Sequence, residues 1–231
     1  MTYLKLLLLR HAQSAGNAAT RMEGQSSTAL TPLGQQQAQR LSQVLYQQQA
    51  PPACFYTSPL LRAVQTLEAL AQPWRSAGHD CPVYQQAQLQ ELHAGIFQGL
   101  TWAEAMDRHP DLCQRLMASL DWLPVPQAET LSAAHTRAAK WVRQILQTHQ
   151  PGETVWAISH GGILQQIIAV LLGCDLTWKL TIPNTALFEF WLAEPGRTLT
   201  DSENRFNPEA QIIRRFNDCS HLQPLARHNL I

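Results

Sequence analysis

Near its start the chain has a short run of leucines that ends in a cation and an imidazole. Residues 6–9 are all Leu, and Arg10 and His11 follow directly, before small and polar residues that include Gly16 and Asn17. A short, continuous apolar run is typical of a parallel strand that is buried on both faces. Ligands of open α/β sheets bind just beyond the carboxyl ends of such strands, so the run predicts Arg10 and His11 at a ligand site.

A second apolar run, much later in the chain, ends in the same way. Residues 154–159 (TVWAIS) are followed by His160, Gly161 and Gly162. If both runs are parallel strands, they deliver His11 and His160 to the same edge of the sheet. The two glycines allow a close approach of the backbone and open a helix, whose N-terminal amides favour an anion.

A second arginine is expected at the same edge. Arg62 lies at the start of a helix that follows a strand predicted over residues 53–57. Arginine forks match phosphate oxygens in a way that lysine does not, so Arg10 and Arg62 together favour an anionic ligand. With two imidazoles beside them, a phosphoryl group is the expected ligand.

Strands and helices are predicted to alternate along the chain. This alternation indicates an α/β fold, a three-layer α/β/α sandwich with a mostly parallel central sheet. We expect a single domain over residues 1–231, with a helical lid inserted at about residues 92–128. Strands are expected over residues 3–9, 53–57, 82–84, 154–159, 185–192 and 211–216. Helices are expected from the Thr31-Pro32 cap to about residue 49, after Ser58-Pro59 until near Pro73, over residues 130–148, and after Gly162, with a polar loop over residues 13–29.

Composition excludes several classes of partner. Seventeen cations balance seventeen anions among 231 residues, whereas binding to nucleic acid or to an anionic membrane demands a basic excess. The five cysteines are scattered without a CxxC pair, so neither a disulfide framework nor a zinc site is predicted. The first apolar run is too short for a signal peptide, and no run approaches the roughly twenty apolar residues of a membrane span. We expect a cytoplasmic protein with reduced thiols and without metal or cofactor. A homodimer stays open at this point.

The motifs, in this order, resemble those of the histidine phosphatase superfamily, the phosphoglycerate mutase-like proteins, and of its phosphatase branch in particular. The resemblance spans nearly the whole chain, to about residue 222. Ala12 departs from the family's usual Gly, and we expect it to be tolerated unless its φ is positive. The matching segments are residues 8–14 (LLRHAQS), 21–24 (RMEG), 30–34 (LTPLG), 58–66 (SPLLRAVQT), 89–91 (LQE) and 159–162 (SHGG).

The resemblance implies a metal-independent phosphomonoesterase. His11 would attack phosphorus and form a phosphohistidine, and Glu91 would act as general acid and then as base. Arg10, Arg62 and His160 would hold the phosphoryl oxygens and stabilise the developing charge. Further residues implied in substrate binding are Asn17, Glu23, Gly24 and Gly161. The expected partner is a small phosphorylated metabolite.

Two other functions stay open at this point. The first is a phosphoglycerate mutase, which would return the phosphoryl group to the substrate and would carry a more basic insertion after Glu91. Between residues 98 and 126 this chain has Arg108 and Arg115, set against Glu104, Asp107, Asp111 and Asp121. That balance favours the phosphatase. The second is a catalytically inactive protein that binds phosphate ligands on the same scaffold, which the intact catalytic set disfavours.

Overall fold

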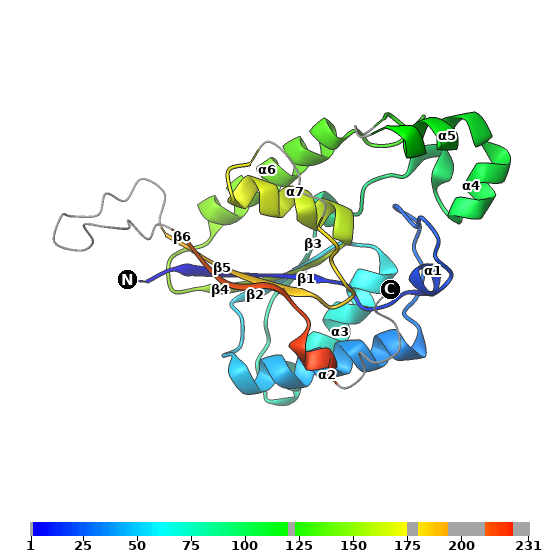
Figure 1. Cartoon of the computed structure of the whole chain (residues 1–231). Coiled ribbons are helices and arrows are strands. Elements are labelled where there is room, and N and C mark those ends of the chain that lie inside the picture. Colours follow the sequence, from blue (N-terminus) through cyan, green and yellow to red (C-terminus); the bar gives the residue numbers. More distant parts are fainter. Residues whose placement is uncertain (1, 120–122, 175–179, 194–210, 224–231) are drawn as a thin grey trace.

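A six-stranded mixed sheet forms the middle layer of the computed structural model, which describes residues 2–119, 123–174, 180–193 and 211–223 (Figure 1). The strand order is β3-β2-β4-β1-β5-β6. The first four strands in this order are parallel, whereas β5 is antiparallel to both β1 and β6. The mostly parallel sheet predicted from the sequence is therefore confirmed. The strands are β1 Leu4–Arg10, β2 Cys54–Thr57, β3 Val83–Gln85, β4 Thr154–Ser159, β5 Leu187–Leu192 and β6 Gln211–Asp218.

Helices cover both faces of the sheet, so the three-layer sandwich is also confirmed. In Figure 1, α2 and α3 lie on one face and α6 and α7 on the other. No helix among the described residues is long and apolar enough to cross a membrane. The helices are α1 Ala15–Ala18, α2 Pro32–Gln48, α3 Leu61–Ser76, α4 Trp102–Arg108, α5 Pro110–Ala118, α6 Leu131–Thr148 and α7 Gly161–Leu171, with single 3₁₀ turns at Ala87–Leu89, Gly95–Phe97 and Ser220–Leu222.

The leucine run of β1 is buried on both faces. Leu6 and Leu8 pack into the hydrophobic cluster under α6 and α7, whereas Leu7 and Leu9 pack into the one under α2 and α3. All four side chains are fully buried. Successive side chains of a strand point to opposite faces, which is why a central strand with helices on both sides needs an unbroken apolar run. The carboxyl end of β1 is thereby fixed within the sheet.

Two local predictions were wrong. The expected loop over residues 13–29 contains α1, which Ser14 caps by accepting a hydrogen bond from the Asn17 amide. Helix α3 does not end near Pro73 but continues to Ser76. Proline inside a helix removes one backbone hydrogen bond, but Trp74 directly after it is buried, and this packing keeps the last turn helical.

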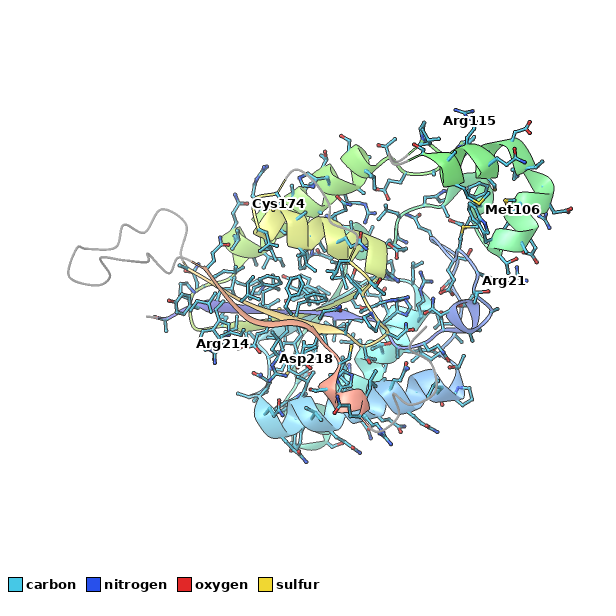
Figure 2. All side chains as sticks on the ribbon, in the orientation of Figure 1. Arg21, Met106, Arg115, Cys174, Arg214 and Asp218 are labelled. Carbon is cyan, nitrogen blue, oxygen red and sulfur yellow. The ribbon has the colours of Figure 1, made fainter. Side chains whose placement is uncertain are left out.

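The segment expected as a lid has a small hydrophobic core of its own. Helices α4 and α5 pack around Phe97, Ala105 and Cys113, and Met106 lies between the two helices (Figure 2). A capping box begins α4, with Thr101 and Glu104 bonded to each other's backbone amides. Residues 120–122, which include Asp121, lie outside the described part of the chain, as do residues 224–231 at the end of the expected domain.

Candidate active site

His11 and His160 meet at the carboxyl edge of the sheet, as the two similar strand ends predict. Strands β1 and β4 are adjacent and parallel, with Arg10 opposite Ser159 in the register. The His11 amide donates a hydrogen bond to the Ser159 carbonyl over 2.9 Å, which continues the ladder past the strand ends. The two imidazole rings lie 4.9 Å apart, centre to centre.

His11 presents one ring nitrogen without a proton. Its Nδ1 lies 2.7 Å from the Ala12 carbonyl oxygen, and its Nε2 lies 3.1 Å from Arg62 Nε. The carbonyl can only accept and the guanidinium can only donate, so these partners assign the ring proton to Nδ1 and the lone pair to Nε2. Burial, followed by the charges of Arg10 and Arg62, holds the pKa of His11 well below its usual 6.5.

Arg62 is buried and held by the loop that follows α1. Its guanidinium donates to the carbonyl oxygens of Gly24, over 2.8 Å, and of Ser26. Gly24, expected from the resemblance among the substrate-binding residues, therefore meets Arg62 through its backbone. Burial lowers the pKa of Arg62 most, against the opposing effects of Glu23 and Glu91.

Two buried polar atoms of the site, Arg10 Nε and His160 Nδ1, have no hydrogen-bond partner within the described part of the chain. Another nitrogen of each side chain has a partner that fixes the group: Arg10 Nη1 donates to the Ile182 carbonyl, and His160 Nε2 lies 2.7 Å from Ser58 Oγ. An unpartnered buried polar atom costs about 1–3 kcal/mol, which an anionic ligand that bonds to it would offset. Both atoms therefore suit the oxygens of a bound anion.

The N-terminus of α7 is occupied by the carboxyl group of Glu91. Its oxygens accept hydrogen bonds from the amides of Gly162 and Ile163, each over 3.0 Å, and from its neighbour Leu92 over 2.9 Å. A Cβ at Gly162 would come within 2.6 Å of Glu91 Oε1, so this position has no room for a side chain. Gly161 lies beside Arg10, where a Cβ would be 3.8 Å from Nε.

Glu23 and Asn17 form a buried network behind Arg62. Glu23 accepts hydrogen bonds from Ser14 Oγ over 2.6 Å, from Asn17 Nδ2 over 2.9 Å, and from Thr28 Oγ1. Its carboxylate also lies 3.8 Å from Arg62 Nε. Both oxygens of Glu23 are thus used within the protein, and so is the side-chain amide of Asn17, which the resemblance implies in substrate binding.

The residue after His11 is an alanine that fits its place. Ala12 is fully buried and its φ is not positive, so the extra methyl causes no backbone strain. Its amide donates to Thr66 Oγ1 over 3.0 Å. The expected tolerance of this departure from the family pattern agrees with this geometry.

Sequence reasoning missed three side chains that hold the site. Ser58 contacts His160, and Thr66 binds the Ala12 amide; both belong to the matching segment 58–66, which was the available signal. Asn184 donates to the His11 carbonyl over 3.0 Å and to Asn17 Oδ1 over 2.9 Å. No pattern in the sequence around Asn184 indicates this role. Among the described residues, no group of three or more His, Cys, Asp or Glu could hold a metal ion.

Comparison with known proteins gives consistent matches over most of the chain. A family model, described as histidine phosphatase superfamily (branch 1), matches residues 6–205. A metal-independent phosphoserine phosphatase of Arabidopsis thaliana is 32% identical over 222 residues, which cover 94% of this chain and 83% of the relative. A 2,3-bisphosphoglycerate-dependent phosphoglycerate mutase of Corynebacterium efficiens is 29% identical, covering 91% of this chain and 94% of the relative. The solved structure of Bacillus stearothermophilus YhfR aligns with a TM-score of 0.77 at 25% identity, over 95% of this chain and 100% of its own.

Proposed function

Because this chain belongs to the histidine phosphatase superfamily (branch 1), we propose that it is a metal-independent phosphomonoesterase that acts on small phosphorylated metabolites. The family and the relatives support an enzyme that is a phosphatase or a mutase. The observation that carries the phosphomonoesterase proposal is the lone pair on His11 Nε2, beside Arg62 and facing His160. A buried, unprotonated imidazole surrounded by cations is suited to attack a phosphoryl group that those cations hold.

In the first step the phosphoryl group moves from the ester to His11. The Nε2 lone pair forms a bond to phosphorus while the bond between phosphorus and the ester oxygen breaks. Arg10, Arg62 and His160 bind the other phosphoryl oxygens and stabilise the charge that develops on them. The ring becomes positively charged, and the Ala12 carbonyl, which holds Nδ1 over 2.7 Å, stabilises that charge.

Glu91 moves the protons in both steps. It gives a proton to the ester oxygen, so that the alcohol leaves, and its carboxylate then takes a proton from the water that attacks the phosphohistidine. The phosphorus–nitrogen bond breaks, inorganic phosphate leaves, and Nε2 regains its lone pair. Among the described contacts, Glu91 Oε1 accepts from Leu92 and Ile163, whereas Oε2 accepts from Gly162. Oε2 has the larger free acceptor capacity and is therefore the atom that carries the proton.

A mutase is the second candidate, because the relatives of similar identity include phosphoglycerate mutases. A mutase has to grip a second anionic group besides the phosphoryl group that it transfers. The cations of segment 92–128 are Arg108 and Arg115, and Arg115 projects from the outer side of α5 (Figure 2). Arg21, the next cation along the α1 loop, is paired with Glu104 over 2.8 Å. These arginines therefore support the phosphatase over the mutase.

The test is phosphate release from a panel of phosphomonoesters in the presence of a chelator. The panel contains O-phosphoserine, other alkyl phosphates and p-nitrophenyl phosphate, and the wild type is measured beside His11→Ala. We expect chelator-resistant release in the wild type and none in the variant, together with a phosphoenzyme that is labile in acid and stable in base. The ranking of the panel then begins to identify the substrate.

Two other results would replace the proposal. Conversion of 3-phosphoglycerate to 2-phosphoglycerate in the presence of 2,3-bisphosphoglycerate, faster than any release, would make the protein a mutase. Binding of inorganic phosphate with neither activity would make it a binding protein on the same scaffold.

A further inference from the structure

Arg137, on the inward side of α6, uses its guanidinium in two directions. Its Nη1 donates to the carbonyl oxygens of Gln88 and Gln90, over 2.6 and 2.8 Å. Its Nε and Nη2 donate to the two carboxylate oxygens of Glu129, over 2.8 and 2.7 Å. The side chains of Arg137 and Glu129 are 18% and 15% exposed, so this ion pair is mostly shielded from water.

The carbonyls that Arg137 holds belong to the segment that carries Glu91. After the 3₁₀ turn at Ala87–Leu89, residues 90–93 have no helix or strand structure. The backbone of residues 88–93 is held by separate hydrogen bonds from other parts of the chain. Besides the two bonds from Arg137, Ser159 Oγ donates to the Leu89 carbonyl over 2.7 Å, and Gln25 Nε2 donates to the Glu91 carbonyl over 3.1 Å. The Glu129 amide donates to the His93 carbonyl over 3.0 Å. The position of the Glu91 backbone thus depends on contacts from outside the segment, and the Arg137–Glu129 pair makes three of them.

We infer that Arg137 and Glu129 form a positioning pair that places the Glu91 carboxyl group for proton transfer to the leaving oxygen. This inference rests on the proposed function and assigns no catalytic role to either residue, since neither bonds to the Glu91 side chain. Displacing a reacting group by about 1 Å costs roughly 100-fold in rate, so the placement of this segment matters to the chemistry.

The geometry also requires arginine at position 137. The side chain makes four hydrogen bonds in one plane, two to backbone carbonyls and two to a carboxylate. Lysine has one ammonium group and cannot bridge the two sides of such a fork. Arg137→Lys therefore retains the charge and loses the bridge.

A purely structural role would also explain the contacts, because breaking a shielded ion pair destabilises a protein. The two roles differ in how the loss depends on the leaving group. An alkoxide must be protonated as it leaves, whereas p-nitrophenolate leaves without a proton. A variant that misplaces the general acid loses rate with alkyl esters and little with the nitrophenyl ester, while a partly unfolded enzyme loses both equally.

The experiment compares kcat/KM for an alkyl phosphate and for p-nitrophenyl phosphate. For Arg137→Met we expect a loss of about tenfold or more with the alkyl ester and less than about threefold with the nitrophenyl ester. Glu91→Gln should show the same pattern with a larger loss, and Arg137→Lys and Glu129→Gln the same pattern with a smaller one. Inhibition by inorganic phosphate should not change. Arg75→Met, which breaks the exposed pair with Glu68, is the matched control and should leave both rates unchanged.

Equal losses for the two esters in Arg137→Lys and Glu129→Gln would overturn the inference, even if Arg137→Met does not fold. The double variant of Glu91→Gln and Arg137→Lys gives a second way to overturn it. If its loss of kcat/KM with the alkyl ester equals the product of the losses in the two single variants, the two residues act independently, whereas residues that act as one unit have losses that do not multiply. Failure of the proposed function is distinguishable, since the wild type itself would then show no His11-dependent release.

Discussion

Imidazoles with little exposure to water lie at both edges of the sheet, where its parallel strands begin and where they end. The two sites differ in the charge of the groups beside the ring. At the carboxyl edge, His11 and His160 lie among Arg10 and Arg62. At the opposite edge, His149 at the end of α6 has a carboxylate partner. Its Nδ1 lies 2.5 Å from Glu153, and its Nε2 lies 3.0 Å from the hydroxyl of Tyr56 in β2. Cys54 Sγ is 3.7 Å from the same Nε2.

The comparison shows that burial alone does not make an imidazole reactive. Both imidazoles have a partner at each ring nitrogen, but the kinds of partner differ. Those of His149 are a carboxylate and a hydroxyl, whereas Nε2 of His11 lies beside the guanidinium of Arg62, which attracts an anion. Burial raises the pKa of Cys54 to about 12 and that of Tyr56 to about 12, which leaves both without a nucleophilic anion at neutral pH. At the other end, burial and the arginines leave a lone pair on His11 Nε2. Under the proposed function, the same residue type thus has a structural role at one end and a chemical one at the other.

The largest difference in kcat between the two ends of the sheet is expected when one histidine is removed at each end. His160→Ala should lower kcat by about 10²–10³-fold, because in the proposed mechanism His160 holds the phosphoryl oxygens in the transition state. His149→Ala should lower the free energy of unfolding through its lost hydrogen bonds and leave kcat/KM unchanged. Steady-state kinetics with the best ester of the panel, beside urea unfolding of both variants, measures the two effects. Similar kinetic losses in both variants would remove the distinction between the two ends.

The carboxylates of the two ends give a smaller test. Glu23 is buried and accepts from Ser14, Asn17 and Thr28, whereas Glu153 is 39% exposed. Glu23→Gln replaces one acceptor oxygen by an amide that donates, so one of the buried donors loses its acceptor. We therefore expect this variant to lower the free energy of unfolding by about 1–3 kcal/mol. Water screens the exposed carboxylate of Glu153, so Glu153→Gln should lower the free energy of unfolding by less than about 1 kcal/mol. Urea unfolding of the two variants checks this, and equal changes would contradict it.

The same contrast explains how far the sequence predicts this molecule. The leucine run and residues 154–159 predict where His11 and His160 meet, because a buried parallel strand has a recognisable pattern and its carboxyl end has a fixed place. The inward direction of Glu23 and the contact of Asn184 with the His11 carbonyl depend on side chains distant in sequence. Helix α3 passing Pro73 depends on the burial of Trp74 in the same way. Local patterns contain no information on such contacts.

The buried histidines at the carboxyl edge also predict how stability depends on pH. The folded pKa values of His11 and His160 lie well below 6.5, mainly through burial. Between the folded values and 6.5 the unfolded chain binds protons that the folded chain does not, so the free energy of unfolding falls as pH falls through this window. Each histidine contributes a slope of about 1.4 kcal/mol per pH unit. His221, with a pKa lowered to about 4 by burial, adds to the same trend.

Replacing one of these histidines by a group that does not titrate should flatten the dependence. For His160→Gln we expect the slope below pH 6.5 to decrease by about 1.4 kcal/mol per pH unit, because one proton fewer distinguishes the unfolded from the folded chain. Urea unfolding at a series of pH values measures the slope, and Arg75→Met, on the exposed side of α3, should retain the wild-type dependence. A His160→Gln slope equal to the wild-type slope would mean that His160 binds its proton equally well in both states. Burial and the neighbouring cations would then not lower the pKa of His160, and the pKa would not distinguish this end of the sheet from the other.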